Sequence, residues 1–270
     1  MVPAGGPQAT EDISMFKDLT KADWLRILNI PESRIPGVLI LRGTRNLRSQ
    51  YQAVLPYFDN VLEVGSPNGI FEDVLIGDLR GRPVGFAAVY GAPMASEIVH
   101  LFGVLGTRAV IQTGNCGALA GDLDAGDLFL AERAFCGEGA AQYYKTDGQW
   151  VAATAALLES AAFAKPSSPK CRRGAIYTTG ALLAEGMDDL EQWFRQGFAA
   201  VDMETAATFA VAEHFGMDRM AILFAFDNPR RREHLLVTDA EKDARRTLAN
   251  AKMKELAFDL AVELCTSYES

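Results

Sequence analysis

Apolar residues follow two patterns along this chain, short continuous runs and segments with helical spacing. The runs at residues 38–41 and 219–226 are typical of strands buried on both faces. Residues 22–28 instead place their large apolar side chains on one face of a helix, and Thr20 with Asp23 resembles a capping pair at its start. The sequence predicts strands at residues 38–41, 61–64, 108–112, 127–134, 174–178, 199–201 and 219–226, and helices at residues 22–28, 47–58, 95–105, 150–163, 187–196, 203–215 and 239–264.

The order of these elements predicts the fold class. Residues 71–79 and 83–90 are two strand-like stretches joined by Arg80-Gly81-Arg82, a sequence typical of a hairpin. Elsewhere strands alternate with helices, which favours a largely parallel sheet covered on both faces. We therefore expect a flexible tail at residues 1–15, and one α/β domain over residues 16–270 with a central mixed, largely parallel sheet flanked by helices.

The charge balance narrows the classes of partner. The 270 residues include 26 Lys and Arg against 35 Asp and Glu, a formal net charge of −9. A surface of that sign repels nucleic acid, so no nucleic-acid partner is expected, although local donors could hold one small anion. The four cysteines and three histidines are scattered without metal-ligand spacing, so no metal site is expected. No apolar run could cross a membrane and no secretory signal is recognisable, so we expect a cytoplasmic protein with no membrane partner.

Polar residues follow several of the predicted strands, at the position where open α/β sheets bind ligands. Gly43 precedes Arg45 and Arg48, which is typical either of a solvated turn or of an anion clamp at a helix start. The segment from Gly114 to Gly117 is either a tight turn or a backbone nest for an anion or sugar. It lacks the features of a P-loop and of a dinucleotide-binding fingerprint.

Two further strand ends carry carboxylates. Asp202 and Glu204 lie at a strand-to-helix boundary, where acidic residues commonly cap a helix. The following helix is strongly apolar, so a carboxylate buried beside it needs partners, and ligand hydroxyls could supply them. Asp227 follows an apolar run and precedes an Asn-Pro turn, so it either caps that turn or serves as a general acid with a raised pKa.

Taken in this order, these segments resemble the nucleoside phosphorylase/nucleosidase superfamily, of the purine nucleoside and uridine phosphorylase type. The resemblance extends from about residue 38 to the C-terminus. Its most specific pair of motifs is the Met-Glu element and the Asp element on successive strands. The segments that carry it are Gly43 with Arg48, Gly91-Ala92-Pro93-Met94-Ala95-Ser96, Gln112-Thr113-Gly114-Asn115-Cys116-Gly117-Ala118, Glu138-Gly139-Ala140-Ala141-Gln142-Tyr143-Tyr144, Val201-Asp202-Met203-Glu204-Thr205-Ala206-Ala207 and Phe226-Asp227-Asn228.

The resemblance implies a role for each matching residue. Glu204 would accept hydrogen bonds from the ribose hydroxyls, and Asp227 would donate or share a proton at N7 of the leaving purine. These two residues are the expected catalytic pair. The implied substrate-binding residues are Met203, Asp202, Asn115, Gly117, Tyr143 and Leu182, and the implied phosphate-binding residues are Gly43, Arg48 with Arg45 as its rival, Gly114 and Asn115. Lys242 and Gln112 would support them.

The family further implies that no cofactor is needed and that inorganic phosphate is the co-substrate. The expected partners are a small-molecule nucleoside or nucleotide, phosphate and further copies of the chain in a dimer or hexamer. The uracil-reading Gln-x-Arg pair is not recognisable around residues 178–183, which favours a purine base.

Departures from the family pattern leave alternatives open. Gln112 stands where phosphorylases carry a phosphate-binding Arg, and Pro93 and Asn115 also differ from the pattern. Nucleosidases, which use water, carry a neutral residue at the position of Gln112, so hydrolysis of a nucleoside is the alternative reaction. The segments also resemble AMP nucleosidase, in which arginines bind a nucleotide phosphate. The arginines that could do so here, although they also suit a solvated loop, are Arg48, Arg230, Arg231 and Arg232. A non-catalytic nucleoside-binding protein is a third possibility.

Overall fold

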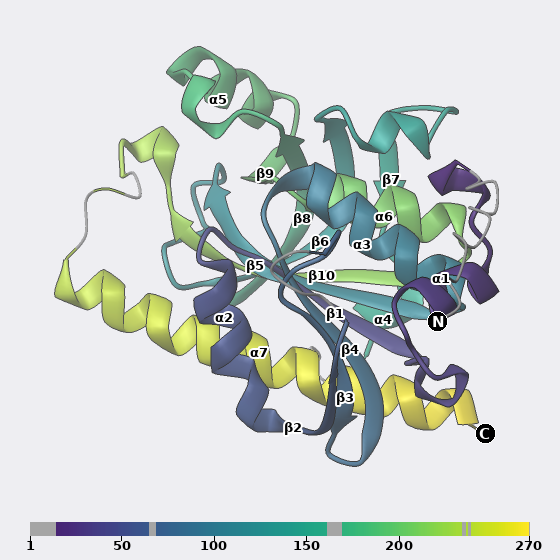
Figure 1. Cartoon of the computed structure of the whole chain (residues 1–270). Helices are drawn as coiled ribbons and strands as arrows, with labels where there is room; N and C mark the ends of the chain where they lie inside the picture. The colour runs from purple at the N-terminus through teal and green to yellow at the C-terminus, as the bar shows by residue number, and fades with distance from the viewer. Residues whose placement is uncertain (1–14, 65–68, 161–168, 234–235, 237–238, 270) are drawn as a thin grey trace, which may run out of the picture.

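The computed structural model describes residues 15–64, 69–160, 169–233, 236 and 239–269 as an α/β fold around one mixed sheet (Figure 1). Its strands are β1 (Val38–Gly43), β2 (Phe58–Glu63), β3 (Val74–Leu79), β4 (Arg82–Val89), β5 (Ala109–Ala118), β6 (Leu128–Gly137), β7 (Trp150–Ala152), β8 (Cys171–Thr179), β9 (Phe198–Asp202) and β10 (Asp218–Asp227). Its α-helices are α1 (Lys21–Ile27), α2 (Leu47–Val54), α3 (Gly91–Leu105), α4 (Ala155–Leu158), α5 (Met187–Arg195), α6 (Thr205–His214) and α7 (Ala240–Glu269). The predicted fold class is confirmed.

The centre of the sheet consists of parallel strands. β1 lies between β4 and β5, and β5 also pairs with β10, all in parallel. The antiparallel β2 and β3 extend the sheet beyond β4. On the other side, β10, β6, β8 and β9 pair in turn, and β9 pairs back onto β5, so five strands close a ring. This closure brings the carboxyl ends of β5, β9 and β10 together.

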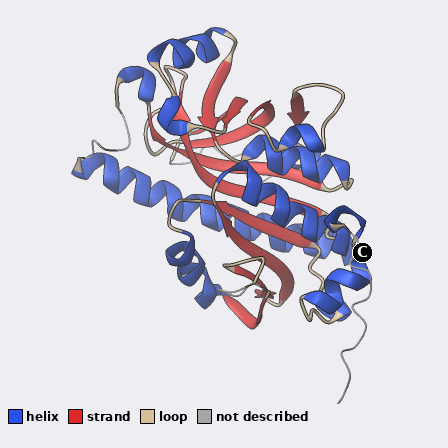
Figure 2. Ribbon diagram, turned by 45° about the horizontal axis from the view of Figure 1, so that its top comes forward, coloured by secondary structure: helices blue, strands red, loops and turns tan. Residues whose placement is uncertain are grey.

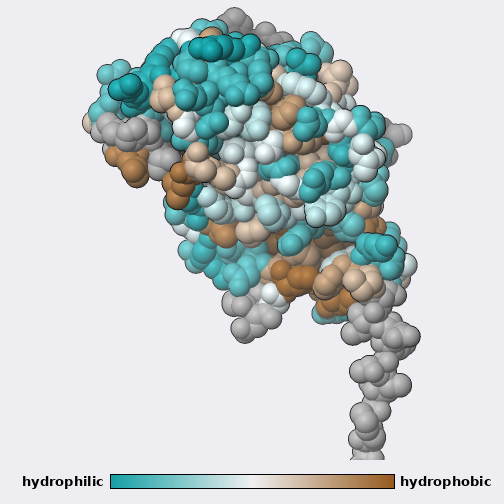
Figure 3. All heavy atoms as spheres, turned by 90° about the horizontal axis from the view of Figure 1, so that it is seen from above, coloured by the Kyte–Doolittle hydropathy of each residue, from teal (hydrophilic) through white to brown (hydrophobic). Residues whose placement is uncertain are grey.

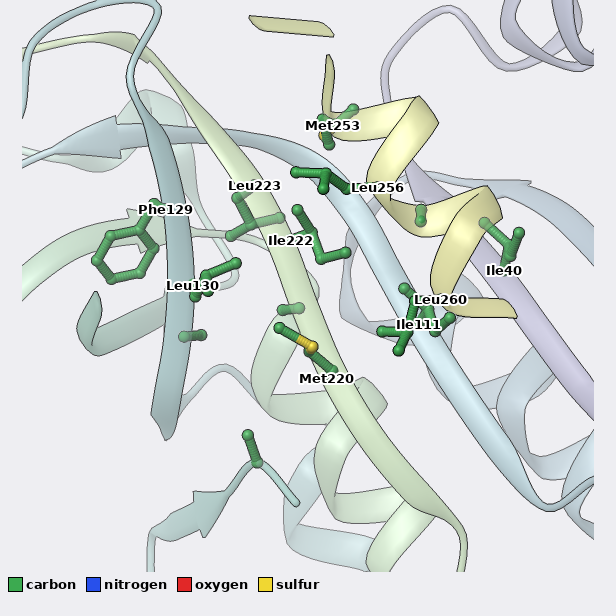
Figure 4. Packing of buried hydrophobic residues seen from close by; sticks show 14 of the residues in the cluster. Ile40, Ile111, Phe129, Leu130, Met220, Ile222, Leu223, Met253, Leu256 and Leu260 are labelled. Carbon is green, nitrogen blue, oxygen red and sulfur yellow. The ribbon is translucent and has the colours of Figure 1, made fainter. Parts of the chain in front are cut away.

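Helices cover the sheet on both sides (Figures 1 and 2). α3 packs against α6, and one hydrophobic cluster joins Leu39 and Leu41 of β1 to Val99 and Phe102 of α3. The long α7 crosses the opposite side, where Met253, Leu256 and Leu260 pack near β1, β5 and β10 (Figure 4). β1 therefore has α3 on one face and α7 on the other, which matters for the two sites described below.

Local sequence signals act as expected at two points. The side chain of Thr20 accepts from the Asp23 backbone while the Asp23 side chain accepts from the Thr20 backbone, so the predicted capping pair starts α1. β3 and β4 form the predicted hairpin, in which Arg80 and Gly81 adopt positive φ angles of 50° and 78°. Two successive positive φ angles give the turn a twist that suits antiparallel strands.

Two expectations about elements are wrong. The helix predicted at residues 150–163 is replaced, within the described residues, by β7 and the short α4, because Trp150 pairs with Phe135 of β6 and the strand pairing overrides an alanine-rich helical pattern. The strand predicted to break at Thr113 continues to Ala118, because β10 and β9 pair with its last residues. Residues 1–14 of the expected tail lie outside the described residues.

No helix in the described part of the chain is long and apolar enough to cross a membrane.

Candidate active site

The carboxyl ends of the central strands meet around three glycines. A Cβ placed at Gly43 would lie 2.9 Å from Oε2 of Glu204, and one at Gly114 would lie 3.3 Å from the Gly43 carbonyl oxygen. A Cβ at Gly117 would lie 3.4 Å from Oδ1 of Asp227. The glycines predicted to cradle a ligand therefore also give the two carboxyl groups the space that they occupy. The structure brings both predicted catalytic residues to this edge of the sheet.

Glu204 is the N-cap residue of α6 and is buried. The residue is 6% exposed, and Oε1 accepts a hydrogen bond of 2.7 Å from the backbone N–H of Gly91. Gly91 has a φ of +80°, a conformation that favours glycine. Burial and the negative charge of Asp202 raise the pKa of Glu204 to about 8, against the opposing effect of Arg42 and the Gly91 hydrogen bond. One oxygen is thus fixed by the backbone, and the other lies against Gly43.

Asp202 positions the turn that carries Met203 and Glu204. Oδ2 accepts from the backbone N–H of Thr205 at 2.8 Å, from its hydroxyl at 2.6 Å and from Gln112 Nε2 at 3.2 Å, and Oδ1 accepts from the Thr178 hydroxyl at 2.8 Å. Burial raises the pKa of Asp202, although these hydrogen bonds favour its charged form. Asp202 and Gln112 are both buried and contact each other, so they lie behind the site.

Asp227 ends β10, and a second carboxyl group lies near it. Its neighbour Asn228 is buried, with Nδ2 donating to the carbonyls of Ala120 and Leu123 at 3.3 and 3.4 Å. Glu185 has a buried Oε1 without a hydrogen-bond partner among the described residues. Burial, then the charges of Asp227 and Asp189, raise the pKa of Glu185 to about 7. The sequence pattern gave no indication of Glu185, which lies just beyond residues 178–183.

The two candidate phosphate arginines differ in their contacts. Arg48 forms a 3.0 Å ion pair with the buried Asp73, and its guanidinium lies 5.7 Å from the Tyr51 ring centroid. Its side chain remains 55% exposed. Arg45 is exposed and lies 4.7 Å over the ring of Tyr90, the residue before α3. Both arginines follow Gly43 in the chain. Only for Arg48 do Asp73 and Tyr51 fix the position of the guanidinium, close to its own helix α2.

The remaining predicted side chains surround this edge with varied exposure. Met203 and Leu182 are partly exposed and Asn115 is exposed, although residues on both sides of Met203 and Asn115 are buried. Tyr143 is 80% exposed. Its segment is held by Glu138, which accepts from the backbone N–H groups of Ala140 and Ala141. The structure thus leaves Met203, Leu182, Asn115 and Tyr143 accessible to a ligand.

The basic loop after β10 mostly contacts the protein itself. Arg230 donates to Glu191 and to the Leu119 carbonyl, and Arg231 pairs with Asp124. Arg230 and Arg231 are thus held by contacts within the protein, whereas the sequence left open a solvated loop or a contact with a nucleotide phosphate.

Arg246, rather than the predicted Lys242, contacts the end of β10. Lys242 lies 3.5 Å from Glu233 and 3.8 Å from Asp239. Arg246, one turn further along α7, donates from Nε to the Phe226 carbonyl at 2.7 Å and stacks 4.1 Å over the Phe226 ring. It therefore anchors the backbone directly before Asp227.

The donor set suits hydrogen bonding to a polar organic ligand. Among the described residues, no group of three or more His, Cys, Asp or Glu side chains could hold a metal ion.

Comparisons with known proteins identify the family and the fold. The sequence profile of the Phosphorylase superfamily matches residues 49–260. The purine nucleoside phosphorylase DeoD-type of Clostridium perfringens (strain SM101) is 30% identical over 195 residues, covering 70% of this chain and 79% of the relative. The same type of protein from Clostridium beijerinckii is 25% identical over 247 residues, covering 88% and 98%. The crystal structure of uridine phosphorylase from Vibrio fischeri ES114 has a TM-score of 0.71 at 22% identity, covering 88% of this chain and 95% of that one.

The buried Glu204 carboxyl predicts that stability falls as pH rises. Its pKa is about 8 in the folded protein against a usual value of 4.5, so the unfolded chain releases this proton first as pH rises. The stabilisation that protonated Glu204 gives the folded protein is therefore fully present below about pH 4.5 and declines up to about pH 8. Between about pH 5.5 and about pH 8, we expect the free energy of unfolding to fall on the order of 1–3 kcal/mol further in wild type than in Glu204→Gln.

Urea denaturation at both pH values measures this difference. The exposed Glu159→Gln variant is the control and should retain the wild-type loss. An equal loss of stability in wild type and Glu204→Gln would contradict the raised pKa.

Proposed function

The chain belongs to the phosphorylase superfamily, and on that premise we propose that it cleaves the N-glycosidic bond of a purine nucleoside with inorganic phosphate, releasing the free base and ribose 1-phosphate. The observation that supports this most is the placement of two buried carboxyl groups at one edge of the sheet, Glu204 beside Gly43 and Asp227 beside Gly117. Such an edge is where α/β sheets bind small ligands.

Each carboxyl group suits one half of the reaction. Glu204, fixed through Oε1 by Gly91, would direct Oε2 at the ribose hydroxyls and hold the sugar as positive charge develops on it. Phosphate oxygen would form the new bond to C1′ while the bond to the base breaks. The electron pair of that bond stays with the base, and Asp227 would supply or share the proton at N7.

The anion would be bound by Arg48 beyond Gly43. The ion pair with Asp73 and the contact with Tyr51 fix its guanidinium, while more than half of its side chain stays exposed. A preorganised guanidinium loses less freedom on binding an oxyanion. Arg45, on the ring of Tyr90, is the alternative.

Hydrolysis is the second candidate, because one phosphate ligand of the phosphorylase pattern is absent. Gln112 is fully buried and donates to Asp202, so it does not face an anion at the open end of the sheet. Asn115 is the accessible side chain at this strand end, and it carries no positive charge to bind phosphate. Water would therefore be the competing nucleophile.

We further expect the protein to act in the cytoplasm as a homo-oligomer, a dimer or hexamer. Leu183, 94% exposed, and Tyr143 are large apolar side chains near the site that a neighbouring copy could cover. The face seen from above is mainly hydrophilic, with hydrophobic patches between the polar side chains (Figure 3).

Product analysis with and without phosphate tests the reaction. We expect inosine or adenosine to yield free base and ribose 1-phosphate only when phosphate is present, and Asp227→Asn to lower kcat by about 10²–10⁴-fold. Asp259→Asn, which removes a carboxylate paired with Arg80 on the far side of the molecule, is the matched control. Phosphate-independent release of base with free ribose, or with ribose 5-phosphate from AMP, would establish hydrolysis instead.

Arginine variants test the anion contact. We expect Arg48→Met to raise the KM for phosphate about tenfold or more, because a charge-assisted hydrogen bond is lost, with a smaller effect on the KM for the nucleoside. Steady-state kinetics at varied phosphate measure both constants, and Arg173→Met is the control for loss of a surface guanidinium. A larger effect of Arg45→Met than of Arg48→Met would assign the contact to the rival residue.

The second carboxyl near Asp227 predicts a pH-dependent base preference. Above about pH 7 the Glu185 carboxylate would accept from the N1–H of a 6-oxopurine, whereas below it the carboxyl could donate to N1 of adenine. We expect the ratio of kcat/KM for inosine over adenosine to rise with pH through neutrality in wild type and in Glu159→Gln. The ratio should stay flat in Glu185→Gln, and an unchanged pH profile in that variant would remove Glu185 from the base site.

A further inference from the structure

A cavity of about 110 Å³ lies between the sheet and the helices α2 and α7. Its polar lining comes from Arg42 of β1, Thr113 of β5, Gln50 of α2, and Asn250 and Lys254 of α7, and the rest of its lining is apolar. No acidic side chain is among the described residues that line it. Two cations around one small cavity are unexpected in a chain with a net charge of −9.

Arg42 has a buried guanidinium whose hydrogen bonding is incomplete. The residue is 7% exposed, Nη2 donates to Asn250 Oδ1 at 3.0 Å, and Nη1 lies 3.5 Å from Met253 Sδ. Nε is buried and has no hydrogen-bond partner among the described residues, and no carboxylate there forms an ion pair with this group. A guanidinium has five N–H donors, and a buried charge requires compensation.

Glu204 does not provide that compensation by contact. Its charge favours the charged form of Arg42, but burial has the larger effect and lowers the pKa of Arg42 to about 10. Arg42 therefore stays charged near neutral pH. Glu204 Oε1 accepts from the Gly91 N–H instead, and among the described residues no hydrogen bond or ion pair joins Glu204 to Arg42. The positive charge is left for another group to balance.

The cavity and the Glu204 site lie on opposite faces of β1. Successive side chains of a strand point to opposite faces. Ile40 and Arg42 face α7, where Ile40 and Met253 appear on facing elements (Figure 4). Leu41 packs on the α3 side, and the Cβ direction of Gly43 points to Glu204. The cavity is thus separate from the site of the proposed reaction.

We propose that this cavity binds a small oxyanion such as inorganic phosphate, between the guanidinium of Arg42 and the ammonium group of Lys254. Lys254 is partly exposed and is positioned by Tyr57, whose hydroxyl lies 2.8 Å from Nζ and whose ring centroid lies 4.1 Å away. Gln50 and Asn250 offer amide N–H groups for further hydrogen bonds. The cavity has room for several water molecules, and therefore for an anion of the size of phosphate.

Phosphate titration of variants on each face of β1 tests the proposal. Calorimetry on wild type should find a phosphate site that Arg42→Met abolishes and that Lys254→Met weakens at least tenfold. Lys252→Met removes a neighbouring lysine on the same helix that does not line the cavity, and it should bind as wild type does. Sulfate and acetate titrations show whether the site prefers a tetrahedral or a planar oxyanion.

Two measurements keep the result independent of folding and of the proposed reaction. Arg42→Met removes a buried charge, and circular dichroism verifies that it folds; Asn250→Leu is a second variant that should also weaken binding. Arg48→Met should retain the Arg42-dependent site even where it loses phosphorolysis. Phosphate binding that is the same in wild type, Arg42→Met and Lys254→Met would overturn the proposal, whether or not phosphorolysis is observed.

Discussion

The buried carboxyl of Glu204 constrains the backbone around it on several sides. Its hydrogen bond to Gly91 requires a positive φ at the start of α3, and its second oxygen requires a glycine at the end of β1. Asp202, both of whose carboxyl oxygens accept hydrogen bonds, fixes the turn from which Glu204 projects. Because an unsatisfied buried carboxyl is costly, these contacts must form together, and they tie β1, α3, β9 and α6 into one site.

Groups of different charge lie on the two faces of β1. The carboxyl group of Glu204 is on the α3 side, and the guanidinium of Arg42 is on the α7 side. At the open edge of the sheet, Glu204 and Asp227 resemble the family pattern and Gln112 departs from it, and the Gln112 amide donates to Asp202 within the protein. Behind β1, Arg42 carries a buried positive charge toward α7. The phosphate-binding Arg of the phosphorylase pattern therefore has no replacement at Gln112. Arg42, on the other face of β1, has a separate ligand under our proposal.

The sequence was sufficient for most of the fold because alternation of apolar runs and helices is a local signal. It failed where pairing between distant segments decided the outcome, as at Trp150, which joins β6, and at Thr113, where β5 continues beside β10. For the site, motif matching predicted the meeting of Glu204 and Asp227. It did not identify Glu185, Arg42 or Arg246, because their significance depends on burial and on neighbours far away in the chain. It also could not show that Gln112 and Asp202 contact each other.

The central claim is that a nucleoside binds with its ribose at Glu204 and its base at Asp227. A crystal structure with phosphate and a purine C-nucleoside, whose carbon–carbon bond resists cleavage, tests it most directly. The account predicts both ribose hydroxyls within hydrogen-bond distance of Glu204, N7 of the base facing Asp227, and a phosphate between Gly43 and Arg48. A sugar bound away from Glu204, or a base bound away from Asp227, would contradict it.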